Sequence, residues 1–144
     1  GADAARSILL VDDNEDAASA TALLLRHLGH SVRVAHSAAA ARALAQEEPA
    51  AVAILDIGLP DMDGYALAGA LREDMRRRAR RDASRGPQMD AAADGDAGAL
   101  RLVALTGYGQ QSDVARALAA GFDVHLTKPA TLEALRRALA TASG

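Results

Sequence analysis

Four short segments of the chain are almost entirely apolar, at residues 7–12, 52–56, 100–106 and 124–127. A run without a polar side is typical of a parallel strand whose two faces are both covered by helices. Residues 32–34 alternate between apolar and polar instead, which predicts an additional strand at the edge of the sheet. The pattern therefore predicts five strands.

Segments with a helical period separate these strands. Residues 15–28 place Ala and Leu on one stripe and end at Gly29, and residues 37–46 begin at Ser37, a good capping residue. Further helices are predicted from Asp63-Gly64 onward, over 111–120 and over 131–141. Alternating strands and helices predict an α/β fold, in which five helices cover both faces of a doubly wound five-stranded parallel sheet.

The length of 144 residues fits one domain, which we place at residues 7–142 after an N-terminal tail of residues 1–6. Residues 77–98 interrupt the pattern as a charged insertion rich in Gly, Ala and Asp between the third helix and the fourth strand. Its arginine cluster, Arg76–Arg81, is interpreted either as a docking patch for an acidic partner or as a solvated extension of the helix.

Composition excludes several classes of function. The chain has no Cys, so disulfides, thiolate chemistry and Cys-based zinc sites are excluded. A net charge of −3 does not indicate the basic surface that nucleic-acid binding requires, and we expect no direct nucleic-acid partner. No apolar run approaches the roughly 20 residues of a membrane span, and the N-terminus lacks a signal-peptide pattern. A cytoplasmic location is expected.

The apolar runs end on polar side chains suited to phosphate chemistry. These side chains are Asp12, Asp13, Asp56, Thr106 and Lys128, and the last is the only Lys among sixteen basic residues. Because strand ends of one polarity share an edge of an open parallel sheet, we expect these groups to converge. Three carboxylates, a hydroxyl and an ammonium predict a magnesium-dependent phosphoryl site.

Each of these residues also has a structural explanation. The segment Asp12-Asp13-Asn14 could simply cap the first helix, because acidic residues favour helix N-termini. Asp56 is harder to explain in this way, since an aspartate that closes an apolar strand must be desolvated and needs partners. With a cation and Lys128 beside it, Asp56 would be ionised and could act as a carboxylate nucleophile.

Taken together, these motifs resemble the receiver domain of two-component response regulators, over residues 7–141. The motifs that carry the resemblance are Asp12-Asp13, Asp56 with Leu59-Pro60 and Asp63-Gly64, Thr106-Gly107 and Lys128-Pro129. Residues 105–110 and 121–123 further resemble receivers of hybrid histidine kinases. The resemblance implies a flavodoxin-like fold with strand order 2-1-3-4-5.

By this resemblance, the chain is a signalling phosphoacceptor that catalyses only its own phosphorylation and dephosphorylation. Asp56 would accept a phosphoryl group from a phosphohistidine on a sensor histidine kinase or a histidine phosphotransfer protein. Mg²⁺ or Mn²⁺ would be held by Asp13, Asp56 and the backbone carbonyl of Gly58, and Asp12 would act mainly through water. Lys128 would neutralise the phosphoryl oxygens.

The resemblance also implies a conformational switch. Thr106 would shift toward the phosphoryl group, and a cis peptide bond is expected between Lys128 and Pro129. Downstream partners would bind the surface of the fourth helix, fifth strand and fifth helix, about residues 111–142, on a monomer or weak dimer. Receivers usually carry Tyr or Phe at the position of His125; this smaller, polar ring is expected to be partly exposed and to respond weakly.

Two alternatives remain open from the residues. An aspartate-nucleophile phosphatase of the haloacid dehalogenase type also uses a strand-end Asp, a Lys and magnesium, but it needs a second Asp two positions after the nucleophile. Gly58 occupies that position here. The other alternative is a receiver-like module that binds its partners without phosphorylation, and the complete set of acceptor residues argues against it.

Overall fold

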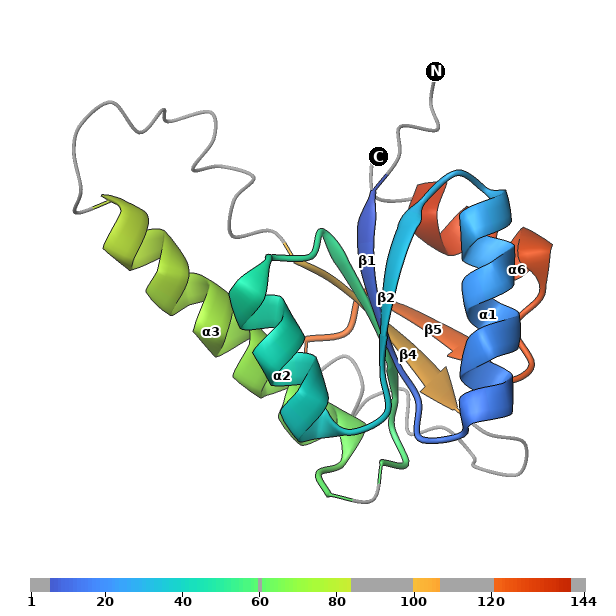
Figure 1. The fold of residues 1–144 in the computed structure, drawn as a ribbon, viewed down its shortest axis with the longest axis horizontal. Helices are drawn as coiled ribbons and strands as arrows, with labels where there is room; N and C mark the ends of the chain where they lie inside the picture. The colour runs from blue at the N-terminus through green and yellow to red at the C-terminus, as the bar shows by residue number, and fades with distance from the viewer. Residues whose placement is uncertain (1–5, 60, 84–99, 107–120, 141–144) are drawn as a thin grey trace.

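The five predicted strands form one parallel sheet in the order β2-β1-β3-β4-β5 (Figure 1). In chain order they are β1 Ser7–Val11, β2 Ser31–Ala35, β3 Val52–Asp56, β4 Arg101–Thr106 and β5 Val124–Thr127. The computed structural model describes residues 6–59, 61–83, 100–106 and 121–140. The predicted fold class and strand order are confirmed.

Helices cover both faces of the sheet. In Figure 1, α1 (Glu15–His27) and α6 (Leu132–Ala140) lie on one face, and α2 (Ala38–Glu47) and α3 (Gly64–Ala83) lie on the other. The helix predicted over 111–120 lies outside the described residues. None of the described helices is long and apolar enough to cross a membrane.

The core consists of two apolar layers, because successive strand residues point to opposite faces. One layer packs β1, β3 and β4 against α1 and α6, with Ile8, Leu10, Ile54, Val103, Leu25 and Leu135 fully buried. The other packs the same strands against α2 and α3, with Leu9, Leu55, Leu102, Leu67 and Leu71 buried. This two-sided burial explains why the strands lack polar positions.

Side-chain caps fix where the helices begin. Asn14 caps α1 by accepting from the backbone N–H of Ala17 at 2.9 Å, so neither Asp12 nor Asp13 is needed for that purpose. Ser37, Asp63 and Thr131 accept from backbone N–H groups three residues later, as their types predict. At the end of α1, the predicted stop at Gly29 is confirmed by its positive φ of 96°.

The first part of the predicted insertion is helical, because α3 continues through residues 77–83. The arginine cluster Arg76–Arg81 therefore extends the helix, and residues 84–98 lie outside the described residues. Two contacts join the long helix to α2: a bidentate pair between Arg42 and Asp74 at 3.0 Å, and a hydrogen bond of 2.9 Å from Arg78 to the carbonyl of Gln46.

Gly64, the first residue of α3, packs directly against the backbone that follows β3. A Cβ atom at this position would lie 2.5 Å from the Cα of Ile57 and 3.0 Å from the carbonyl oxygen of Asp56. Gly69, one and a half turns further along α3, has no atom within 4 Å of its virtual Cβ. Gly64 thus has no room for a side chain, whereas Gly69 has.

We predict that Gly64→Ala lowers the free energy of unfolding by about 1–3 kcal/mol, since backbone atoms must move to admit the methyl group. The matched change Gly69→Ala should raise it by about 0.5–1 kcal/mol, because alanine is the better helix former. Urea unfolding of both variants would measure the difference. Equal effects at the two positions would contradict the close packing at Gly64.

Candidate functional site

Polar groups from the ends of β1, β3, β4 and β5 meet at the carboxyl edge of the sheet. The Nζ of Lys128 lies 3.0 Å from Oδ2 of Asp12 and 3.1 Å from Oδ2 of Asp56. One carboxylate oxygen from each of Asp12, Asp13 and Asp56 lies within 4.8 Å of the others. The structure thus brings the three predicted carboxylates and the ammonium into one cluster.

Asp12 and Asp13 follow β1 but differ sharply in exposure. Asp12 is 1% exposed, and its Oδ1 accepts from the backbone N–H of Asn14 at 3.0 Å. Its own N–H donates to the carbonyl of Ala35 at 3.0 Å, which extends the pairing of β1 with β2 by one residue. Asp13 is exposed to solvent. One carboxylate is therefore fixed inside the cluster, and the other lies on its open side.

Asp56 closes β3 and is 6% exposed. Its Oδ1 accepts from the backbone N–H of Gly58 at 2.9 Å, and Oδ2 faces Lys128. Burial by itself raises the pKa of Asp56, but the Gly58 N–H and the Lys128 ammonium outweigh it and hold the pKa below its ordinary value. Asp56 is therefore ionised near neutral pH.

Asp12 and Lys128 are shifted by the same burial. Burial raises the pKa of Asp12 above its ordinary value of 3.8, and the nearby charge of Asp56 adds to this effect. For Lys128, burial favours the neutral amine, but the hydrogen bonds to Asp12 and Asp56 prevail and raise its pKa. A single ammonium faces two buried carboxylates, so the cluster carries an excess of negative charge.

The donor set fits a divalent metal. Carboxylate oxygens are the preferred ligands of Mg²⁺, which usually binds one or two of them and keeps several waters. One ammonium faces two nearly buried carboxylates, so Lys128 alone does not balance the buried charge, and exposed Asp13 leaves the cluster open to solvent. These residues therefore suit a partly hydrated magnesium ion.

Thr106 ends β4 next to this cluster and is 2% exposed. Its Oγ1 donates to the carbonyl of Leu126 on β5 at 3.4 Å, a long hydrogen bond, and its own carbonyl accepts from the N–H of Lys128 at 2.8 Å. The predicted cis peptide bond between Lys128 and Pro129 is confirmed. Gly107, which follows Thr106 in the motif, lies outside the described residues.

His125 lies on β5, at the position where receivers usually carry Tyr or Phe, and it is half-buried. Its Nε2 is buried and has no hydrogen-bond partner among the residues that the structure describes. The expectation of a partly exposed ring is confirmed. Its response to phosphorylation remains a prediction.

Sequence reasoning missed two contacts that position the site. Asp61, in the loop after β3, accepts from the N–H groups of Ala38 and Ala39 at 3.0 and 3.2 Å and so ties this loop to the start of α2. These hydrogen bonds hold the pKa of Asp61 below its ordinary value. A signal existed, because the first turn of α2 has no acidic residue of its own. The other contact is His36, whose Nδ1 lies 2.9 Å from the carbonyl oxygen of Asp12.

Comparison with known proteins identifies the family. Residues 8–79 match the model of the response regulator receiver domain. The chain belongs to this family. It is 33% identical over 139 residues to the photosynthetic apparatus regulatory protein RegA of Cereibacter sphaeroides, covering 96% of this chain and 62% of RegA. A 14.6 kDa protein from the sodA1 3′ region of Leptolyngbya boryana is 32% identical, covering 85% of this chain and 78% of that protein.

Solved structures agree with this assignment. A response regulator protein from Burkholderia pseudomallei, with a phosphorylated aspartic acid, a calcium ion and citrate, is 27% identical with a TM-score of 0.71, covering 96% of this chain and 70% of that one. A CheY-like receiver domain from Methanospirillum hungatei shares the fold with a TM-score of 0.72 at 23% identity, covering 98% and 100% of the two chains. The chain is therefore a phosphoacceptor receiver domain of two-component signalling.

We predict that Asp12→Asn raises the free energy of unfolding of the metal-free receiver near neutral pH. Because the folded-state pKa of Asp12 is raised, folding favours its protonated form, and its ionisation destabilises the fold above that pKa. The advantage of the variant should vanish as pH falls below 3.8, the ordinary value.

Urea unfolding with a chelator and with excess Mg²⁺ would test this. Mg²⁺ should stabilise the unmodified receiver more than the variant, because a bound ligand stabilises the folded state by mass action. A variant that is less stable than the unmodified protein in chelator would contradict the excess of negative charge.

Proposed function

We propose that Asp56 accepts a phosphoryl group from a phosphohistidine on a sensor histidine kinase or a histidine phosphotransfer protein, in a reaction that depends on Mg²⁺ or Mn²⁺. The observation that carries this proposal is the buried, ionised carboxylate of Asp56 at the end of β3, 3.1 Å from Lys128 and grouped with Asp12 and Asp13. An oxygen of Asp56 forms the new bond to phosphorus. The phosphorus–nitrogen bond breaks, and the imidazole leaves with a proton.

Positioning and charge neutralisation carry the reaction, as in phosphoryl transfer generally. Gly58 and Lys128 hold the two oxygens of Asp56 in fixed directions, at 2.9 and 3.1 Å. Asp13, Asp56 and the carbonyl of Gly58 would bind the metal directly, with Asp12 acting mainly through water. The bound metal supplies positive charge to the phosphoryl oxygens. The phosphorylated aspartic acid and calcium ion described for the Burkholderia pseudomallei relative support this arrangement.

Thr106 is the proposed sensor of the phosphoryl group. Among the described residues, its hydroxyl donates one long hydrogen bond, to Leu126, and a bond of this length opposes a shift toward Asp56 only weakly. The change would pass to residues 111–142, the fourth helix, fifth strand and fifth helix of the resemblance, where a downstream protein binds. In this scheme His125 responds weakly, because its ring is smaller and more polar than Tyr or Phe.

The chain is proposed to act as a cytoplasmic signalling domain that turns over no substrate other than its own phosphoaspartate. A phosphatase of the haloacid dehalogenase type is not favoured, since Gly58 supplies a backbone N–H to Asp56 but no general acid. A module independent of phosphorylation would not need Lys128 between two buried carboxylates. The chain spans 62% of the length of RegA.

We predict that acetyl phosphate with Mg²⁺ adds one phosphoryl group to the receiver and that Asp56→Asn abolishes the addition. The amide keeps the shape of the side chain but lacks the nucleophilic oxygen. Intact-protein mass spectrometry would measure the addition. Asp16→Asn is the matched control, because Asp16 is an exposed carboxylate in the first turn of α1. Phosphorylation of Asp56→Asn to the same level as this control would contradict the assignment of Asp56 as the acceptor.

We also predict that Lys128→Arg slows phosphorylation by at least about tenfold although the charge is retained. The planar guanidinium is larger than the ammonium and cannot approach two carboxylate oxygens at 3.0 and 3.1 Å from the same point. The control is Arg80→Lys, which makes the opposite exchange at an exposed position. Initial rates with acetyl phosphate would decide, and an unimpaired Lys128→Arg variant would show that lysine is incidental there.

A further inference from the structure

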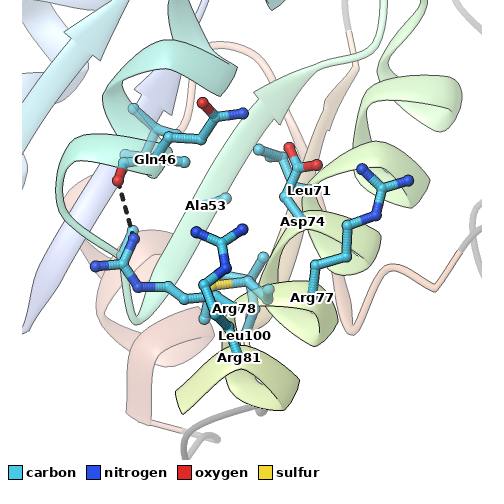
Figure 2. A pocket seen from close by; sticks show the side chains of 12 residues that line it. Gln46, Ala53, Leu71, Asp74, Arg77, Arg78, Arg81 and Leu100 are labelled. Atoms are coloured by element: carbon cyan, nitrogen blue, oxygen red, sulfur yellow. Dashed lines mark hydrogen bonds between the residues drawn. The ribbon is translucent and has the colours of Figure 1, made fainter. Parts of the chain in front are cut away.

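A cavity of about 300 Å³ opens between α2, α3 and the sheet, away from the phosphoacceptor site. Its lining comes from the middle of β1, the start of β3, the residue before β4, the last turns of α2 and the arginine-rich part of α3 (Figure 2). Asp12, Asp13, Asp56, Thr106 and Lys128 do not line it. The proposed function therefore gives this cavity no role.

The floor of the cavity is apolar and consists partly of small side chains. Leu9, Leu71 and Leu100 are buried in the layer that α2 and α3 cover. Ala45 and Ala53 face the same space, one from the helix and one from the strand. Because alanine ends at Cβ, these positions leave room that a larger apolar residue would fill. The cavity follows from the residue types chosen at these positions.

The rim is positively charged. Arg77, Arg78 and Arg81 lie along one side of α3 and line the opening. The acidic group among the lining residues, Asp74, is paired with Arg42 through two hydrogen bonds of 3.0 Å, so it does not neutralise the rim.

The contacts of Arg77 and Arg78 leave the charge of these two side chains largely available. Arg78 donates to the neutral carbonyl of Gln46 at 2.9 Å, as the dashed line in Figure 2 marks, and a guanidinium has further N–H donors. Arg77 approaches Glu73 at 3.6 Å in an exposed pair, and such pairs are weak. At Arg77 and Arg78, an incoming anion would therefore compete with weak or uncharged partners.

We propose that this cavity binds a small organic anion, with a carboxylate head on a compact apolar or aromatic body. The body would occupy the apolar floor, and the carboxylate would pair with the arginine forks at the rim, which match its planar geometry. A cavity of about 150 Å³ already admits a benzene ring, so about 300 Å³ holds one ring with a short side chain. The volume lies at the lower end of small-molecule sites.

Three probes separate the contribution of the apolar body from that of the carboxylate. Phenylpropionate carries both the apolar body and the charge, phenylpropionamide keeps the body without the charge, and acetate keeps the charge without the body. In NMR titrations of the full chain, phenylpropionate should bind saturably and shift the amide signals of Ala45, Ala53 and Leu71. The amide should bind at least about tenfold more weakly, because it lacks the charge-assisted hydrogen bonds, and acetate should give no saturable shift.

Matched variants test the lining. Arg78→Gln and Arg81→Gln should each weaken phenylpropionate binding by about tenfold, and Arg80→Gln, which removes the same charge from an exposed position outside the lining, should change it little. Ala45→Leu should abolish binding by filling the space, whereas Ala43→Leu on the exposed side of α2 should not. If Ala45→Leu fails to fold, the arginine variants decide.

Several outcomes would overturn the proposal. These are equal affinity for the acid and its amide, equal effects of Arg78→Gln and Arg80→Gln, shifts away from the lining residues, or binding of acidic peptides without binding of phenylpropionate. Asp56→Asn should keep full affinity, because the cavity and the acceptor site share no residue. Failure of this proposal is thus distinguishable from failure of the phosphoacceptor assignment.

Discussion

The contact on which the rest of the site depends is the ammonium of Lys128 between Asp12 and Asp56, at 3.0 and 3.1 Å. Two nearly buried carboxylates would repel each other and lose their hydration if this charge were absent. One ammonium balances only one of these two negative charges. The cluster therefore favours additional positive charge, and the same imbalance that weakens the fold favours the binding of a metal cation.

The sheet holds this cluster together through backbone pairing that continues beyond the strand ends. The N–H of Asp12 donates to Ala35, that of Ile57 to Leu105 and that of Lys128 to Thr106, at 2.8 to 3.2 Å. Each bond fixes the backbone where a functional side chain begins. Polar groups can be held within hydrogen-bond distance of one another because the apolar layers on both faces leave the strands little freedom to shift.

Much of the fold and the site followed from the sequence for identifiable reasons. Strands buried on both faces leave uninterrupted apolar runs, and caps such as Ser37 and Thr131 are local signals that neighbouring residues do not override. Strand order depends on long-range pairing and came from the family resemblance. Asp12 is buried and Asp13 is exposed because of the direction in which the chain leaves β1. The residue types alone do not predict that direction.

Other features could not be predicted because they depend on distant partners. The sequence left open whether the arginine cluster is a docking patch or an extension of the helix. Local ion pairs of Glu73 with Arg76 and Arg77 support the extension, and the pair of Asp74 with Arg42, which anchors it to α2, was not predicted. The tether from Asp61 to α2 joins residues more than twenty positions apart. The cavity is a property of volumes left between packed elements, and no pattern along the chain reports it.

The helix α3 connects the acceptor site to the arginines that line the cavity. Its first residue, Gly64, packs on the backbone beside Asp56, and its later turns supply the arginines at the cavity. A helix of 20 residues spans about 30 Å as one stiff body. Occupancy of the cavity would alter phosphorylation only if the position of α3 differed between the two states, since a ligand shifts an equilibrium only by its difference in affinity. The tight contact at Gly64 makes the acceptor loop sensitive to such a displacement, because backbone rather than a flexible side chain opposes it.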